Sequence, residues 1–216
     1  MIGETINAPY AEKFTVSNVF SSDMVVQRGE HIRVWGFADA SENGHKVSGE
    51  FMGMFAEARI ENGAWTLTFG ARLNACAEQG NSMRIYTDRT AFVFENVLVG
   101  DVFMVIGQSN VAYSMAAHRA AVPEAERGGV GYDVPSTPIR LHYNSLMQET
   151  GVTRGTEEVC AELRNRETWK RADAAAVQDF SALGYLFAAE YARATGVPVG
   201  VIEIDGNGQP IGAFLP

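Results

Sequence analysis

The chain has 216 residues, and its 17 Lys and Arg against 26 Asp and Glu give a formal charge of −9. A composition of 46% hydrophobic and 20% charged residues is that of a chain that buries a core, which excludes disordered and collagen-like proteins. The acidic balance argues against a nucleic-acid or membrane partner, since both need clustered Lys and Arg. At about 150 residues per domain, the length predicts one domain and part of a second.

The first residues and the cysteines indicate where the protein is located and whether it contains disulfides or a metal site. Residues 1–14 carry no basic start and no apolar run, so a cytoplasmic location is expected. No stretch approaches the roughly 18 apolar residues of a membrane helix. Cys76 and Cys160 stand 84 positions apart and outside any C-x-x-C pattern, which predicts two buried thiols rather than a disulfide or a metal site. No metal or organic cofactor is indicated.

Residues 14–99 have the two-residue apolar period of β-strands. Residues 31–37 form one such run, and Trp65, Leu67 and Phe69 alternate with threonines in another. Asn62-Gly63 predicts a type I′ hairpin turn just before the second run. Further strands are expected at residues 83–85 and 92–99. The pattern predicts an antiparallel β-sandwich over residues 1–97, with no cluster of catalytic residue types.

From Gly100 the pattern is that of an α/β unit. Residues 102–106 predict a strand buried on both faces, followed by a turn at 107–110 and a helix over 111–118. Residues 138–143 and 199–204 predict two more strands. The clearest helix runs from Phe180 to Tyr191, with Asp179 or Ser181 as N-cap and Gly196 as its end. Residues 123–138 and 148–166 are expected to be long surface loops.

Ligands of open α/β sheets bind beyond the carboxyl ends of the strands, which here are residues 107–110 and 205–209. Ser109 lies in the turn between a predicted strand and helix, where its own amide would favour a developing oxyanion. It is therefore a candidate nucleophile. Since Ser is also a preferred N-cap residue, Ser109 capping the next helix is the structural alternative.

The motif around Ser109 resembles a known family. The letters GDVF at residues 100–103 and GQSN at 107–110 resemble the GDVW and GQSNM blocks of SGNH hydrolases of the sialate O-acetylesterase family. Other segments agree in order and spacing: FSSDMVVQRG at 20–29 with VWG at 34–36, NVLV at 96–99, Trp169 with FSALGYLF at 180–187, and GVPVGVI at 196–202 through GQPIGAF at 208–214. The resemblance spans nearly the whole chain.

This resemblance implies a fold, a reaction and a set of residues. The fold would be a jelly-roll-like β-sandwich followed by a flavodoxin-like α/β/α esterase domain, and the substrates O-acetylated sugars or sialic acids. Ser109 matches the nucleophile, and its N–H and that of Gly208 match oxyanion donors, although Gly208 also suits a plain turn. Gln108 and Asn110 belong to the motif, as loop brace and helix cap in the simpler interpretation. Asp101 is expected to fix the start of the strand.

The general base of the family is missing from this sequence. A serine hydroxyl needs an oriented base, which the family takes from a late D-x-x-H motif. None of the four histidines follows an Asp at that spacing. His45, three residues after Glu42, comes nearest but lies in a predicted loop of the β-sandwich. The residues that depart from the family pattern near the site leave its specificity open: Val111, Ala112, Gly206, Gly212 and Phe214.

The number of strands also falls short of an esterase domain. Residues 98–216 supply at most three parallel strands, whereas doubly wound domains commonly have about five. We therefore expect this region to be the N-terminal part of such a domain, its open edge covered by a missing C-terminal part or an oligomer partner. Two alternatives stay open: a non-catalytic glycan-binding or scaffold protein with a degenerate esterase fold, and an acetylxylan-type esterase.

Overall fold

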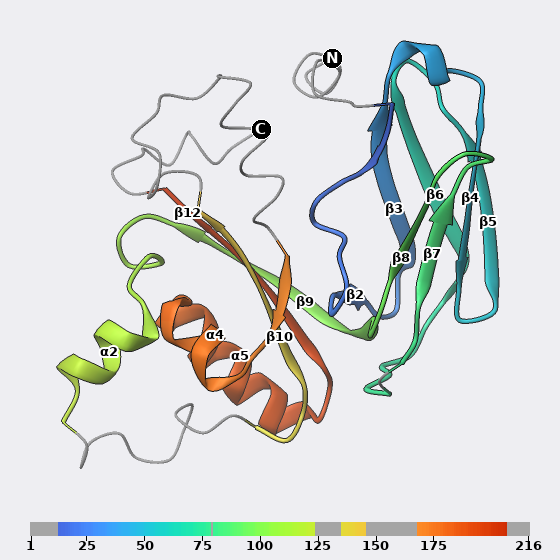
Figure 1. Ribbon diagram of the computed structural model, residues 1–216. Helices are drawn as coiled ribbons and strands as arrows, with labels where there is room; N and C mark the ends of the chain where they lie inside the picture. The colour runs from blue at the N-terminus through green and yellow to red at the C-terminus, as the bar shows by residue number, and fades with distance from the viewer. Residues whose placement is uncertain (1–12, 79, 124–134, 146–167, 207–216) are drawn as a thin grey trace.

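The computed structural model describes residues 13–78, 80–123, 135–145 and 168–206 (Figure 1). Its N-terminal part consists of two antiparallel sheets. The first has the order β1-β3-β6, and the second the order β5-β4-β7-β8. The bounds are β1 (Phe14–Val16), β3 (His31–Ala38), β4 (Lys46–Phe51), β5 (Met54–Arg59), β6 (Ala64–Arg72), β7 (Met83–Tyr86) and β8 (Ala91–Phe94), with a short 3-10 helix, η2 (Ala40–Glu42).

The two sheets enclose one apolar core, as a sandwich does. Trp65, Leu67 and Phe69 of β6 are buried while the threonines between them are exposed, as the alternation predicted. The sheets approach closely at Gly49, where a Cβ would lie 2.8 Å from Leu67 Cδ1. Asn62 and Gly63 both have positive φ, 52° and 75°, so the predicted I′-type geometry of the β5–β6 turn is confirmed.

The second part is a five-stranded sheet of order β11-β10-β12-β9-β2. Its strands are β2 (Val25–Gln27), β9 (Leu98–Gly107), β10 (Ile139–Ser145), β11 (Trp169–Arg171) and β12 (Val199–Asp205). All neighbouring pairs are parallel except β10 with β11. The result is a β-rich α/β fold with mixed sheets. The proposed boundary at residues 97–98 remains a prediction, and β2 pairs across it.

The strand predicted over residues 92–99 is wrong, because the chain turns within it. β8 ends at Phe94, Asn96 has φ 56°, and β9 begins at Leu98. The amide of Leu98 donates to the carbonyl of Met24, so the chain leaves β7 and joins β2. For the same reason β9 is longer than the predicted 102–106.

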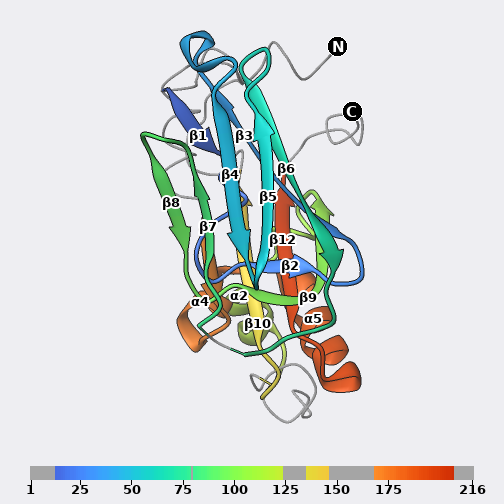
Figure 2. The same cartoon turned by 90° about the vertical axis from the view of Figure 1, so that its right-hand side faces the viewer.

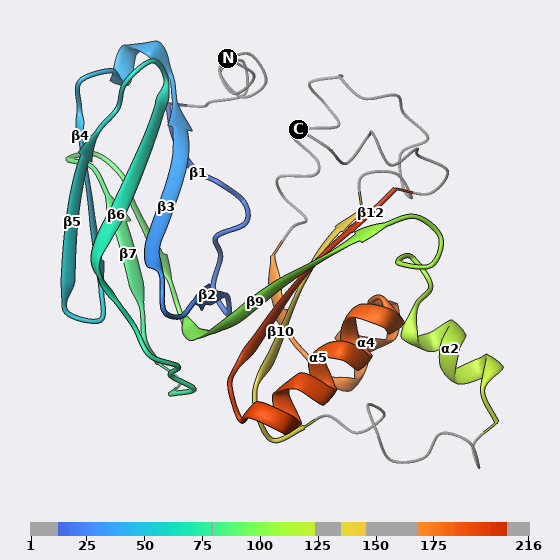
Figure 3. The ribbon, with the colours of Figure 1, turned by 180° about the vertical axis from the view of Figure 1, so that it is seen from behind.

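Three helices, α2 (Met115–Ala121), α4 (Ala174–Asp179) and α5 (Ala182–Thr195), lie on one side of the parallel strands, and the sandwich lies on the other (Figure 3). The ends of α5 are as predicted: Ser181 Oγ accepts from the Gly184 amide, and Gly196 is left-handed at φ 67°. The helix predicted at 111–118 is wrong in position, since α2 starts at Met115.

The apolar period predicts that α5 buries the face formed by Phe180, Leu183, Gly184, Phe187, Ala188 and Tyr191, and this prediction holds only in part. The small residues Gly184 and Ala188 are buried, whereas Leu183 and Phe187 are 57% and 47% exposed. A Cβ on Gly184 would lie 3.0 Å from Val105 Cγ1, so the small residues allow α5 to sit close to the sheet. Large side chains at these positions would hold the helix away from β9 and β12.

Several other predictions have mixed outcomes. The expected loops at 123–138 and 148–166 lie largely outside the described residues, as does Cys160. Cys76 is half-buried rather than buried, and its Sγ lies 3.7 Å from Asn81 Nδ2. Within the described ranges, no helix has the length and apolar character needed to cross a membrane.

Candidate active site

Ser109 lies on a tight turn that begins where β9 ends. The carbonyl of Gln108 accepts from the amides of Val111 and Ala112 at 2.9 and 3.0 Å, which closes one helical turn. A Cβ on Gly107 would lie 2.8 Å from Val111 Cγ2, so a side chain there would open the turn. The chain therefore reverses within four residues of the strand and presents Ser109 at its tip.

Both ends of this loop are fixed by backbone hydrogen bonds. At one end, the Gly206 amide donates to the Gly107 carbonyl at 2.9 Å. At the other end, the Met115 amide donates to Phe180 and the Ala182 amide donates to Tyr113, at 2.9 and 2.8 Å. These bonds tie residues 107–115 to β12 and to the start of α5. The Ser109 turn thus has a defined position although its residues are exposed.

The structure separates the two interpretations of Ser109. The N-cap of α2 is Ser114, whose Oγ accepts from the Ala117 amide, so neither Ser109 nor Asn110 caps that helix. The amide of Ser109 was expected at the N-terminus of the next helix. It lies instead at the first position of the short turn that the Gln108 carbonyl closes. Ser109 is exposed, and no hydrogen bond ties up its hydroxyl among the residues that the structure describes. This is the arrangement a reacting hydroxyl needs, although the described part of the chain places no base beside it.

The other predicted site residues are placed as follows. Gln108 and Asn110 are exposed on the same turn, and Gln108 braces it through its carbonyl. Gly208 lies outside the described residues. Gly206, two residues earlier, holds the end of β12 beside Gly107 through the hydrogen bond given above. The two predicted strand ends therefore do meet at one edge of the sheet.

Asp101 lies at the opposite end of β9, about 20 Å from Gly107 at roughly 3.3 Å per residue. Its carboxylate accepts from Arg28 Nε and Nη2 at 2.9 Å each, from Tyr191 Oη at 2.8 Å and from Gln27 Nε2 at 3.2 Å. The Arg28 guanidinium is the main reason that the pKa of Asp101 is lowered. Asp101 thus joins β2, β9 and α5 through side-chain hydrogen bonds.

Two buried carboxyl groups near the end of β12 were missed from the sequence. Glu203 and Asp205 are each 1% exposed. Glu203 Oε2 accepts from the Ser181 amide at 2.8 Å, directly beneath the point where α5 meets the Ser109 loop. Burial, with a smaller contribution from Asp205, raises the pKa of Glu203 to about 8. The acidic letters within an apolar strand were the only signal in the sequence.

The histidines do not complete the site. His45 Nδ1 lies 3.7 Å from Glu42 and 3.9 Å from Asp88. His45 directly precedes β4, and β4 lies in the sandwich, away from the end of β9 (Figure 1). His142 is buried against the Trp169 ring, and burial lowers its pKa. No contact between a histidine and Ser109 occurs in the part of the chain that is described. Nor does that part contain a group of three or more His, Cys, Asp or Glu suited to a metal ion.

Comparison with known proteins finds a likeness in fold to a solved structure. No protein family and no curated protein matches the sequence. The fold is similar to that of a carbohydrate acetylesterase from Xanthomonas citri, with a TM-score of 0.71 and 24% sequence identity. The match covers 93% of this chain and 42% of that one, so the chain spans about two fifths of the length of this structure. At this identity the likeness shows a shared fold.

Proposed function

We propose that this chain is the nucleophile-bearing part of a carbohydrate O-acetylesterase of the SGNH class, with Ser109 as nucleophile. The observation that carries the proposal is the exposed Ser109 hydroxyl on a turn fixed at both ends, at the carboxyl edge of a parallel sheet. The shared fold with a carbohydrate acetylesterase supports the substrate class. Acetylated sialic acids and acetylated xylan are the two substrates to compare.

The reaction would be an acyl transfer in two steps. Ser109 Oγ attacks the acetyl carbonyl, its proton passes to a base, and the sugar hydroxyl leaves with a proton. Water then hydrolyses the acetyl-serine and releases acetate. The amide of Ser109 would hold the oxyanion, together with that of Gly208, and one such donor is typically worth about 10² to 10³ in rate. No metal or cofactor takes part in this proposal.

The base would come from outside the described residues, and the sheet has an open edge where further structure can add. Beyond Gly100, β9 pairs only with β12 among the described strands. Met104 and Ile106 are 56% and 44% exposed on this strand. We propose that a further part of the esterase domain, or a partner chain, covers this edge and supplies the histidine.

The proposal predicts chemical rescue by imidazole. Acetate release from acetylated xylo-oligosaccharides and from O-acetylated sialic acid would be measured on the 216-residue chain, with and without imidazole as an external base. We expect release above the protein-free blank only with imidazole, and its loss by about 10²-fold or more in Ser109→Ala.

Ser41→Ala removes an exposed serine of the sandwich and serves as the matched control. Release that survives in Ser109→Ala would assign the chemistry to another group. No release on any substrate at any imidazole concentration would favour the non-catalytic alternative. Release without imidazole that depends on Ser109 would show that the chain already holds a base, and preference between the substrates would separate the sialate and acetylxylan alternatives.

A further inference from the structure

The sheet β5-β4-β7-β8, whose strands lie toward the viewer in Figure 2, carries a hollow on its outer face. The hollow belongs to the sandwich, whereas Ser109 follows β9 of the other sheet. The volume of the hollow is about 490 Å³, within the range of about 300–1,000 Å³ typical of small-molecule sites. The hollow exists because Ser48, a small residue, stands at the middle of the central strand β4. Its neighbours Glu57 and Tyr86, directly across on β5 and β7, are long, so Ser48 forms the floor.

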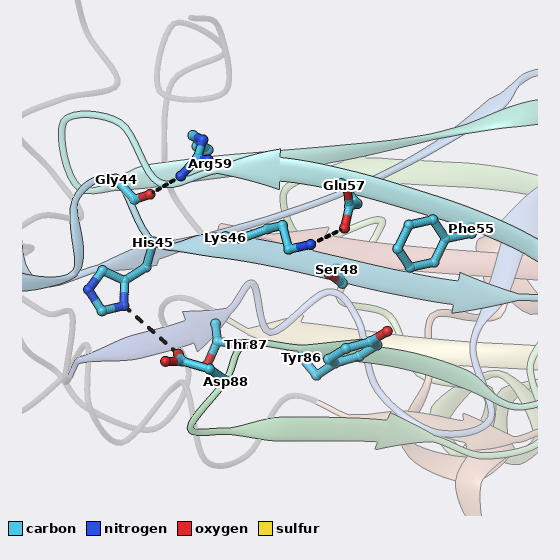
Figure 4. Close-up of a pocket in the computed structure, with 10 residues that line it drawn as sticks. All are labelled: Gly44, His45, Lys46, Ser48, Phe55, Glu57, Arg59, Tyr86, Thr87 and Asp88. Carbon is cyan, nitrogen blue, oxygen red and sulfur yellow. Dashed lines mark hydrogen bonds and ion pairs between the residues drawn. The ribbon is translucent and has the colours of Figure 1, made fainter.

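Two aromatic side chains wall this hollow. Phe55 on β5 is 56% exposed, and Tyr86 stands on β7 on the other side of Ser48 (Figure 4). Tyr86 is held in place, since its hydroxyl donates to Glu50 Oε1 at 2.8 Å and the Arg84 guanidinium lies 4.4 Å from its ring centre. Arg84 lines a neighbouring hollow and not this one. The Tyr86 ring therefore contacts Arg84 on one side and lines this hollow on another.

The charges around the hollow are balanced. Two cations, Lys46 and Arg59, and two anions, Glu57 and Asp88, line it together with His45. Lys46 Nζ pairs with Glu57 Oε1, and Arg59 Nη1 donates to the Gly44 carbonyl (Figure 4). The site therefore has no net charge to attract an ion, but it offers both donors and acceptors beside apolar rings. A neutral ligand with many hydroxyls and apolar C–H faces fits this chemistry.

A second hollow continues along the same face. It has a volume of about 540 Å³ and shares Phe55 with the first. Glu50 and Arg84 line it beside Met54, so it repeats the mixture of opposite charges and apolar surface. Because Phe55 lines both hollows, they adjoin at this exposed aromatic ring. We define the glycan groove as these two hollows.

We propose that the glycan groove binds a neutral oligosaccharide chain, with Phe55 and Tyr86 stacking on sugar rings and the charged side chains bonding to hydroxyls. This binding site is separate from Ser109 and does not depend on the proposed esterase activity. It would hold a polysaccharide on the sandwich while another part of the protein acts on it. The ligand chemistry follows from the residues of the groove alone.

Binding of xylohexaose and cellohexaose to the chain would be measured by calorimetry, with the anionic hexagalacturonate as comparison. We expect a neutral hexasaccharide to bind and hexagalacturonate not to bind. Phe55→Ala should weaken binding by about five- to tenfold, because a stacking ring is lost. Ser48→Asn should abolish it by filling the floor of the hollow.

Phe187→Ala is the matched control, since Phe187 is also a half-exposed phenylalanine but lies on α5. Ser109→Ala should bind as the wild type does, which keeps this result independent of the esterase. Melting curves of each variant would establish that it folds. Three outcomes would overturn the proposal. They are binding by Phe55→Ala and Ser48→Asn as tight as that of the wild type, a preference for hexagalacturonate, and no binding of either neutral sugar.

Discussion

Glu203 is a carboxyl group at a strand position where an apolar side chain is the rule. Its neighbours in register are Val105 on β9 and Tyr143 on β10, and its face is covered by α5. Burial disfavours the charged form, so the pKa is raised to about 8 from an ordinary value of 4.5. The Ser181 amide gives the carboxyl one partner, which partly offsets the burial. At neutral pH the side chain is therefore mostly protonated.

This raised pKa predicts how stability depends on pH. Between pH 4.5 and about 8 the folded state keeps a proton that the unfolded state has lost, so the free energy of unfolding falls as pH rises. Glu203→Gln keeps an acceptor for Ser181 and removes the ionisation. We expect it to be more stable than the wild type at pH 8, by on the order of a few kcal/mol, and about equal at pH 4.

Urea unfolding at both pH values tests this, with Glu190→Gln on the exposed side of α5 as the control. A pH dependence that is the same in Glu203→Gln and in the wild type would mean that Glu203 ionises at an ordinary pH in the folded protein. The same would follow if Glu190→Gln changed the dependence as much as Glu203→Gln did.

At the scale of elements, close backbone approach sets where β9 and β12 meet. A Cβ on Gly100 would lie 2.0 Å from the Pro198 carbonyl oxygen, and the Asp101 amide donates to that same oxygen at 2.9 Å. Since the clashing atoms belong to the backbone, they cannot turn away. β9 and β12 can therefore pair at their starts only because Gly100 has no side chain.

Gly100→Ala is therefore expected to destabilise the protein by at least about 1–3 kcal/mol, the usual range for forced overpacking. Gly70→Ala, on β6 with nothing within 4 Å of the added Cβ, should be neutral or stabilising by less than about 1 kcal/mol. Chemical denaturation of both variants compares them directly. Similar losses at the two positions would show that strand propensity, and not the contact with Pro198, decides the effect.

The elements also show which features could be predicted from the sequence. The β5–β6 turn, the caps of α5 and the alternation in β6 depend on neighbouring residues, and each was predicted. The start of α2 was not, because Ser114 and Ser109 are both good caps locally and the choice depends on pairing with residues near Ser181. The exposure of Leu183 and Phe187 on α5 was not predicted for a similar reason, because the apolar period of a helix does not show how far the sheet extends beneath it.

The same division holds for the candidate site. Ser109 was predicted because its signal is local: an apolar strand followed at once by a tight turn with a recognisable motif. The hydrogen bonds that fix Gly107 and Tyr113 join residues 99 and 69 positions apart. The bond from the Ser181 amide to Glu203 beneath the loop joins two residues 22 positions apart on different elements. Neither could be predicted from local patterns, because they arise only when α5 packs on the sheet.

At the scale of the whole molecule, the described residues form two cores that meet at β9. One lies between the sandwich sheets and reaches Val99 and Trp169, and the other lies between the parallel sheet and α5. The second half of β9 is not covered by either core. Met104 and Ile106 are exposed on its face away from the helices. Leu183 and Phe187 are exposed on α5. Apolar side chains thus flank an edge strand on both sides, which is the arrangement that attracts further chain.

We expect the isolated 216-residue chain to self-associate through this edge at high protein concentration, since nothing among the described residues pairs with it beyond Gly100. The double variant Met104→Lys with Ile106→Lys should shift the chain toward monomer, because charged side chains on an edge oppose strand addition. Light scattering coupled to size exclusion, over a hundredfold range of concentration, measures this. Met52→Lys, which adds the same charge at an exposed methionine of the sandwich, should leave the association unchanged. The prediction is wrong if the wild-type chain stays monomeric throughout the range. It is also wrong if Met52→Lys reduces association as much as the double variant does, since the apolar edge of β9 would then not be the contact surface.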